Sequence, residues 1–374
     1  MPDRYHIAVF AEFWNGFHRA LLRGIGRYAQ RRGDWSITMP AMAPGVPLDL
    51  ADWRVDGAIL ATRRSDLPPG VPSVSLGDPA EGTASIVPDW DRVGRLAAEH
   101  LAELGLRRFA FFGDERSYSE TRWTAFRNAV EAMGFAVERG DAPDPRTTWA
   151  ARLETIGDWL TGLASPVGVF AVNDEFARLV LEAARFAGLG APDQVAVLGA
   201  HNIPEICAMT SPGLSSVDTD GARVGRLAAE LLADLLDGNA GAGPRRRVVE
   251  PRGVIERGST GVVAIGDAVV ADALRYIREH ACDPVGPEEV AGAVNMSRRG
   301  LELRFRRSIR WSPSKLILRH QLRRARQLLA ETDMPMSRVA EACGFRDGVR
   351  FSKVFGREAG QTPTAYRRTM RRRD

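Results

Sequence analysis

Two segments near the C-terminus combine a helical apolar face with a basic outer face, which is the chemistry needed to contact a polyanion. Residues 298–309 turn Leu301 and Phe305 inward, and residues 347–359 turn Phe351 and Phe355 inward, at helical spacing. The outward or capping side chains that we predict to make such contacts are Ser297, Arg298, Arg299, Glu302, Arg306, Arg346, Asp347, Arg350 and Lys353.

Each basic segment follows a shorter helical pattern and a tight turn. The segments 287–294 and 336–343 have helical spacing, and the turns after them hold Asn295-Met296 and Gly344-Phe345. We therefore predict two helix-turn-helix units, at about 285–309 and 336–359, that contact double-stranded DNA. A single arginine-rich helix is more simply a solvated face, but two in tandem favour DNA. Whether each arginine contacts a base or a phosphate stays open.

A helix predicted over residues 313–329 joins the two units. At ~1.5 Å per residue it is about 25 Å long, which suits recognition helices in successive major grooves ~34 Å apart. The charge distribution agrees, because residues 263–374 carry a net charge of +10 and residues 1–262 a net charge of −6. This sign change indicates that the C-terminal part alone meets a polyanion.

The first two thirds of the chain alternate between apolar runs and amphipathic helices. Apolar runs include residues 6–10, 109–113 and 195–199, and helical patterns follow the first two of them. Such alternation predicts doubly wound parallel sheets. The length is enough for two lobes, so we expect a two-lobed α/β domain over 1–262, followed by an all-α domain over 263–374.

The C-terminal part resembles the AraC-type DNA-binding family. The resemblance rests on VAEACGF at 339–345, FSKVF at 351–355 and GQTP at 360–363, and it spans almost all of 268–370. MSRRGLELRF at 296–305 is similar to the first helix-turn-helix unit of that family. Arg310 stands where the family usually ends a helix with glycine.

The N-terminal part resembles the LacI-type effector domain, a fold shared with periplasmic sugar-binding proteins. VND at 172–174, the segment from Gly188 to Gly199 and PGLSSV at 212–217 carry this resemblance. The order of the two parts is similar to that in the family of xylose operon regulators. The resemblance implies a sugar such as xylose bound between the lobes, with the chain crossing near 102–108, near 222–225 and in the final strands.

The resemblance implies Asp89, Arg122, Asn173 and Asp174 as ligand residues, and the further predicted ligand residues are Phe17, Tyr118 and His201. Carboxylates, amides and guanidinium groups hydrogen-bond hydroxyls, and the two aromatic rings would stack on a sugar. Lobe core is an equal alternative for these rings, and a helix N-cap is an alternative for Asp174. His201 stands where the family usually has an aspartate, so another sugar, an acidic ligand or another pose stays open. Asn202 is the alternative polar contact.

Other protein classes fit the sequence less well. Nucleotide-binding, serine-hydrolase and zinc-protease motifs are absent, and three scattered cysteines and six scattered histidines favour no metal site and no cofactor. We predict a cytoplasmic, non-enzymatic, homodimeric transcription regulator with no membrane partner, and RNA polymerase is a candidate partner. The alternative is an enzyme or sugar-binding protein with a basic tail.

Overall fold

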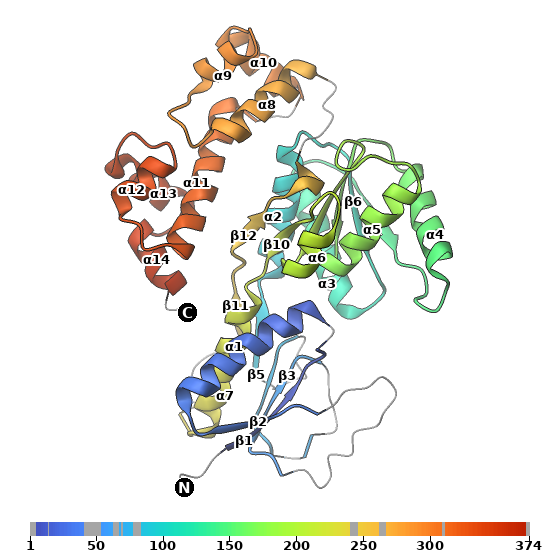
Figure 1. The fold of residues 1–374 in the computed structure, drawn as a ribbon, viewed down its shortest axis with the longest axis vertical. Coiled ribbons are helices and arrows are strands. Elements are labelled where there is room, and N and C mark those ends of the chain that lie inside the picture. Colours follow the sequence, from blue (N-terminus) through green and yellow to red (C-terminus); the bar gives the residue numbers. More distant parts are fainter. Residues whose placement is uncertain are drawn as a thin grey trace.

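The protein consists of two α/β lobes and a helical C-terminal domain (Figure 1). The computed structural model describes residues 5–13, 15–40, 54–62, 67–68, 70–77, 84–239, 246–261, 267–308 and 311–371. This architecture confirms the predicted fold class. The predicted domain boundary at 262/263 lies outside the described residues. Within the described part of the chain, no helix is long and apolar enough to cross a membrane.

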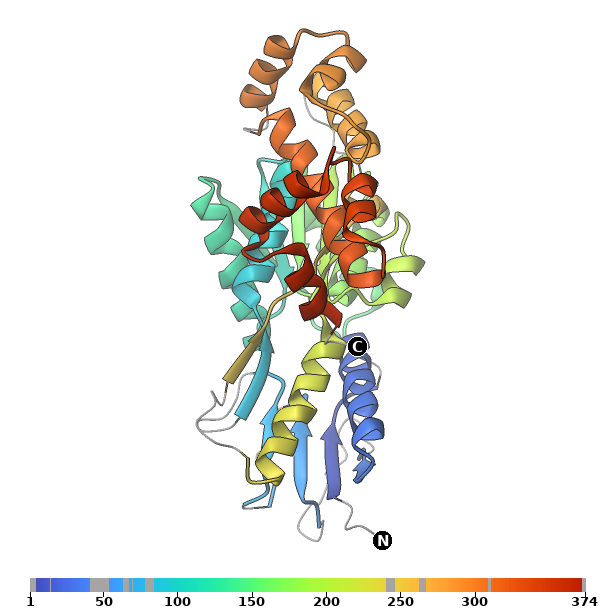
Figure 2. The same cartoon turned by 90° about the vertical axis from the view of Figure 1, so that its left-hand side faces the viewer.

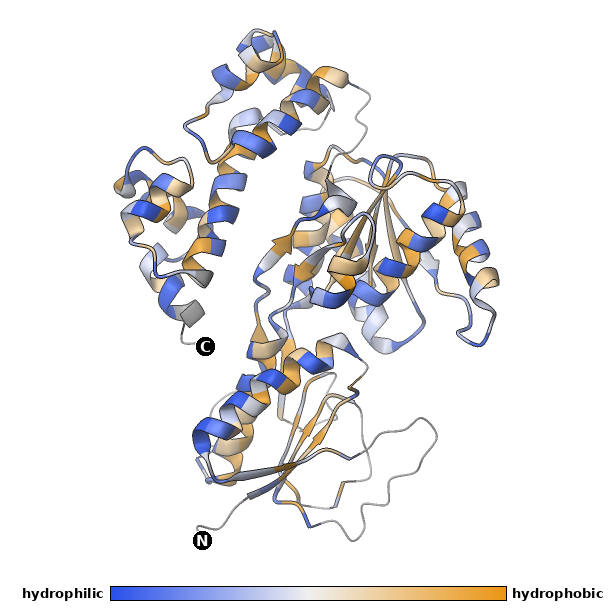
Figure 3. Ribbon diagram, in the orientation of Figure 1, coloured by the Kyte–Doolittle hydropathy of each residue, from blue (hydrophilic) through white to orange (hydrophobic). Residues whose placement is uncertain are grey.

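The first lobe contains a parallel six-stranded sheet with the order β11-β5-β4-β3-β1-β2. Strand β1 from Ile7 onward and the whole of β3 are apolar and buried (Figure 3), as is typical of strands inside a parallel sheet, whereas β11 begins with two arginines. The strands are β1 (Tyr5–Phe10), β2 (Trp35–Thr38), β3 (Gly57–Leu60), β4 (Ser73–Ser75), β5 (Ala84–Pro88) and β11 (Arg246–Val249).

The second lobe repeats this plan with the order β12-β10-β9-β8-β6-β7, in which only the β10–β12 pair is antiparallel. The strands are β6 (Phe109–Gly113), β7 (Val137–Asp141), β8 (Val167–Ala171), β9 (Val195–Ala200), β10 (Ser215–Asp218) and β12 (Gly253–Ile255). The helices of this lobe are α2 (Trp90–Glu103), α3 (Ser117–Ala132), α4 (Trp149–Gly162), α5 (Asp174–Phe186) and α6 (Pro204–Met209).

The chain passes between the lobes three times. It crosses at Asp89 between β5 and α2, at Thr219–Asp220 after β10, and at 250–252 between β11 and β12. The first crossing is therefore more than a dozen residues before the predicted position near 102–108. The reason is that α2 buries Ala97 and Leu101 in the core of the second lobe rather than the first.

Two helices cover the first lobe and touch backbone to backbone. They are α1 (Gly16–Arg32) and α7 (Gly221–Leu236). A methyl group on Gly24 would lie 1.9 Å from the carbonyl oxygen of Ala222, and one on Gly225 would lie 2.1 Å from that of Leu21. These glycines therefore allow the close approach that holds the N-terminal end of α1 near the second lobe.

The C-terminal domain contains two small apolar cores joined by one long helix. The helices are α8 (Ala268–His280), α9 (Pro287–Ala293), α10 (Arg298–Ser308), α11 (Pro313–Glu331), α12 (Met336–Ala342), α13 (Gly348–Ala359) and α14 (Pro363–Arg371). Leu301 and Phe305 pack in the first core, and Phe351 and Phe355 in the second, as predicted. Ile309, the end of the predicted first unit, and Arg310 lie outside the described residues.

Candidate ligand site and DNA-binding surface

Four side chains meet where the two lobes face each other, and we call them the lobe junction: Phe17, Trp90, Arg122 and His201. Phe17 lies at the start of α1, and its ring stacks on the imidazole of His201 with centroids 4.1 Å apart. Trp90 meets His201 edge-on at 5.8 Å, and the Arg122 guanidinium lies 3.9 Å from the Trp90 ring centroid. The contact therefore joins the first lobe to the second through aromatic and cationic groups.

Two of the predicted ligand residues cap helices at this edge of the sheets. The Asp89 carboxylate accepts a hydrogen bond from the Arg92 N–H at 2.8 Å, and the Asn173 carbonyl accepts one from the Phe176 N–H at 2.9 Å. Each cap satisfies an N–H group that the first turn of a helix leaves unpaired. The helix N-cap that the sequence offered as an alternative role for Asp174 thus belongs to Asn173.

Asp174 is fully buried, and its hydrogen bonds stay within the second lobe. Its carboxylate accepts hydrogen bonds from the Ser216 hydroxyl at 2.6 Å and from the Ile203 N–H at 2.7 Å. Burial raises its pKa to about 8, although these two donors oppose the shift. Asp174 therefore holds the loop after β9 in place, and its exposed area is too small for a direct ligand contact without rearrangement.

Tyr118 lies on α3 one turn before Arg122, which belongs to the lobe junction. The Tyr118 hydroxyl donates to Asp114 at 2.9 Å, and burial together with the Asp114 charge raises its pKa to about 12. Arg122 is 7% exposed and donates from Nη1 to the Val172 carbonyl at 2.6 Å. Burial lowers the pKa of Arg122 to about 10, so its guanidinium is still a cation at neutral pH.

His201 faces the lobe junction, whereas Asn202 turns into the second lobe. The His201 Nδ1 lies 2.9 Å from the Thr219 hydroxyl, and the residue has a left-handed backbone with φ +98°. Asn202 instead contacts Asp218 and Arg257. Burial, followed by the nearby Arg122 charge, lowers the pKa of His201 well below its ordinary value. Its imidazole is therefore neutral at physiological pH.

The predicted DNA contacts gather on exposed faces of α10 and α13 and their caps. Ser297 and Asp347 accept hydrogen bonds from backbone N–H groups three residues ahead. Arg298 differs from the other basic residues because it pairs with both Glu288 and Glu302. The remaining predicted side chains, Arg299, Arg306, Arg346, Arg350 and Lys353, are exposed to solvent.

The C-terminal domain contacts the second lobe through ion pairs of α11, and in Figure 2 the helices from α11 to α14 are drawn in front of that lobe. Arg319 on α11 donates to Glu99 at 3.1 Å and also pairs with Glu103, and both glutamates lie on α2. Arg323 pairs with Glu256, which also contacts the buried His100 at 3.3 Å. Burial alone would raise the pKa of Glu256, but His100 and Arg323 hold it below its ordinary value.

Glu99 and Glu103 contribute differently to this contact. Burial raises the pKa of Glu103 to about 8, against the opposing charges of Arg319 and Arg323. The Arg319–Glu103 contact therefore gains its full charge only on the alkaline side of neutral. The half-buried Glu99 accepts a hydrogen bond from Nη2 of Arg319 at 3.1 Å.

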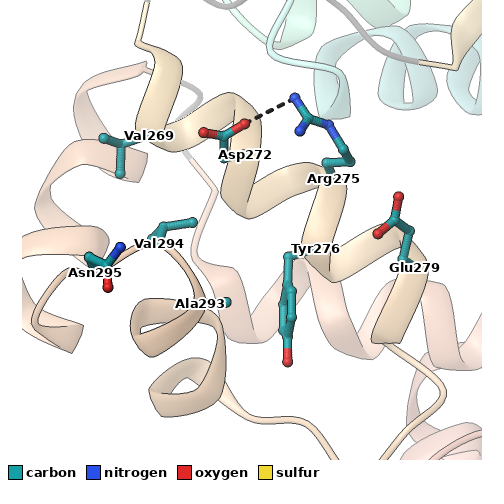
Figure 4. Close-up of a pocket in the computed structure, with 8 residues that line it drawn as sticks. All are labelled: Val269, Asp272, Arg275, Tyr276, Glu279, Ala293, Val294 and Asn295. Carbon is teal, nitrogen blue, oxygen red and sulfur yellow. Dashed lines mark ion pairs between the residues drawn. The ribbon is translucent and has the colours of Figure 1, made fainter.

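A separate hollow of about 370 Å³ lies on the C-terminal domain, between α8 and the turn after α9 (Figure 4). An ion pair joins Asp272 and Arg275 at 2.9 Å, and Tyr276 and Asn295 also line the hollow. None of its lining residues is among the predicted sugar or DNA contacts. It therefore belongs to neither surface described above.

Sequence reasoning missed Trp90, Thr219 and His18 at or near the lobe junction. Trp90 follows Asp89 directly at the end of an apolar strand, a position where ligand residues of parallel sheets gather, so its place was a usable signal. Thr219 and His18 carried no comparable pattern. Their position depends on the crossing after β10 and on the approach of α1, which are tertiary features.

Comparisons with known proteins agree with this architecture. A periplasmic binding protein-like domain matches residues 98–260, and a helix-turn-helix domain matches residues 290–369. The xylose operon regulatory protein of Escherichia coli K12 is 29% identical over 97% of both chains, and that of Haemophilus influenzae is 30% identical over 73% of this chain and 71% of its own length. The structure of the xylose-binding transcription activator xylR aligns with a TM-score of 0.63 and 27% identity, covering 98% of this chain and 99% of the other. The chain belongs to the family of xylose operon regulatory proteins, which are DNA-binding transcription regulators of the helix-turn-helix type.

Proposed function

We propose that the protein is a cytoplasmic transcription regulator, rather than an enzyme, that binds a sugar at the lobe junction and operator DNA through α10 and α13. Membership of the xylose operon regulator family supports both parts. The proposed ligand contacts are Phe17, Asp89, Tyr118, Arg122, Asn173 and His201, with Asp174 supporting the loop that carries His201. A homodimer and RNA polymerase at the promoter are the further partners that we propose.

Helix α2 connects the proposed sugar site to the DNA-binding domain. Helix α2 begins at Asp89 and Trp90, beside the lobe junction, and its last turns hold Glu99 and Glu103 against α11. Helix α11 in turn joins the two helix-turn-helix units. A change in lobe closure that moves α2 therefore moves the helix that sets the spacing of the two recognition helices. Ligand affects DNA affinity through this path only if it favours one lobe arrangement over another.

Substitution of Arg319 tests this path. Arg319→Gln removes the contacts with both α2 glutamates, whereas Arg324→Gln removes an arginine of the same helix whose contact, with Gln327, stays within α11. We expect the Arg319 variant to bind sugar and DNA but to lose most of the effect of sugar on DNA affinity. The Arg324 variant should keep the effect. DNA affinity is measured by fluorescence anisotropy, on duplexes selected from a random pool by the wild-type protein.

If sugar changes the DNA affinity of the wild type and of the Arg319 variant equally, the contact between α2 and α11 does not transmit the effect. Absence of any sugar effect in the wild type, across neutral and acidic pentoses and hexoses, would contradict the proposed function itself.

A further inference from the structure

Two large apolar side chains of the C-terminal domain face solvent. Among the residues that the structure describes in this domain, Leu303 on α10 is 49% exposed and Val349 on α13 is 81% exposed. Apolar side chains scattered singly over a surface are common and need no explanation. These two lie one on each recognition helix, so a shared role in binding would account for both.

Each of the two side chains projects from the side of its helix opposite the apolar core. Leu303 lies midway between the fully buried Leu301 and Phe305, and at about 100° per residue it points away from both. Val349 stands in the same way two residues before the fully buried Phe351. Both side chains therefore belong to the faces that we propose to enter DNA.

Cations flank both side chains on the same faces. Arg299 lies one turn before Leu303, and Arg306 lies one turn after it. Lys353 lies one turn after Val349. All three cations are exposed. The centre of a protein–protein interface is typically depleted of charge, whereas the phosphates on either side of a DNA groove attract cations, so this arrangement favours DNA as the occupant.

The start of α13 is open to a close approach. Gly348 directly precedes Val349, and a methyl group on Gly348 would have no neighbour within 4 Å. Because this position has no side chain, the backbone of α13 can come closer to a base edge. In the major groove thymine displays its C5 methyl group, which apolar side chains contact.

We propose that Val349 and Leu303 recognise thymine, each packing against the C5 methyl group of one thymine in the major groove while the flanking cations contact phosphates. This inference rests on the proposed binding of DNA through α10 and α13, and it specifies a base that these helices select. The two side chains form no hydrogen bond with a base, so their selectivity comes from the apolar contact alone.

Replacement of thymine by deoxyuridine tests the proposal, because the two bases differ only in the C5 methyl group. Each thymine of a duplex selected from a random pool by the full-length protein is replaced in turn, and the affinity is measured by fluorescence anisotropy at fixed salt. We expect a loss of about fourfold at one or more thymines for each helix, as for one methyl-sized group removed from an apolar contact. Val349→Ala should abolish the loss at one set of positions, and Leu303→Ala at the other.

Val248→Ala provides a matched control, because Val248 is a half-exposed valine on β11 in the first lobe. It should leave every effect of deoxyuridine unchanged. Alanine favours a helix more than valine or leucine does, so neither test variant should unfold, and melting temperatures equal to that of the wild type verify this.

The variants and the duplexes separate the outcomes. A deoxyuridine effect that persists in both variants belongs to the shape of the DNA and overturns the proposal. Equal affinities for thymine and deoxyuridine at every position also overturn it, and they would leave a protein as the partner of these side chains. An effect abolished by one variant only overturns the claim for the other side chain. In each of these cases the proposed function stands, whereas equal affinities of the wild type for the selected and a scrambled duplex would contradict that function itself.

Discussion

Replacement of Arg350 by alanine tests how the second recognition helix contacts DNA. Arg350 lies in the first turn of α13, next to the Asp347 cap, and its side chain is exposed. Arg357, near the end of the same helix, pairs instead with Glu358. Arg350→Ala therefore removes a cation that faces solvent, without unpairing a buried group, and Arg357→Ala provides a control of the same helix and the same charge change.

The magnitude follows from the type of contact. A bidentate arginine–guanine contact is worth ~1–3 kcal/mol, which corresponds to a loss of about fivefold to about 150-fold in specific affinity. Because the side chain is exposed, we expect no measurable change in melting temperature. Fluorescence anisotropy on the selected duplex and on a scrambled duplex should show this loss for the selected duplex only. Equal losses on both duplexes, with a salt slope reduced by about one, would refute base recognition and assign Arg350 to a phosphate.

Three further predictions concern the ligand domain. Gly24→Ala should lower the free energy of unfolding by ~1–3 kcal/mol, because its methyl group would lie 1.9 Å from a carbonyl oxygen of α7. Gly26→Ala, whose methyl group would have no neighbour within 4 Å, should raise the free energy of unfolding by ~1 kcal/mol. Urea unfolding measures both variants, and equal effects would contradict the close packing of α1 on α7. Residues 1–262 alone should keep a sugar-induced rise in melting temperature, and an insoluble or unresponsive fragment would show that the two domains share a core. Because the folded-state pKa of Asp174 is raised to about 8, the folded protein holds a proton that the unfolded chain releases near its ordinary value of 3.8, so stability falls as pH rises between these values. Asp174→Asn should therefore show a shallower fall in melting temperature from pH 5 to pH 8, and parallel curves would contradict the buried, protonated carboxyl.

Features that repeat along the chain were predictable from sequence. The apolar strands and the faces of Phe305 and Phe351 depend on local periodicity, and the structure has them where that periodicity puts them. The predicted position of the first crossing between the lobes was wrong. The amphipathic pattern of α2 fits packing against either lobe, and the sequence does not show in which of the two cores Leu101 is buried. The strand β7, with a polar and half-exposed pattern, gave no apolar signal and was not predicted.

The ligand site was also only partly predictable from sequence. Motifs indicated which residues belong to it, but not their charges or their hydrogen-bond partners. The sequence places His201 among the predicted ligand residues but does not give the charge of its imidazole. In the structure, burial and the Arg122 charge oppose protonation of His201, and the Asp174 carboxyl accepts from Ser216. Such charge balance arises from elements distant in sequence, and therefore only the assembled fold reveals it.

The central claim is that one chain couples a sugar site to a DNA-binding surface, and thermodynamic reciprocity tests it most directly. The affinity of the full-length protein for the tightest-binding sugar is measured by calorimetry, with and without a saturating selected duplex. The affinity for that duplex is then measured with and without saturating sugar. Coupling predicts that both affinities change by the same factor, typically about 5- to 150-fold. Sugar and DNA that bind with unchanged affinities in each other's presence would contradict the account.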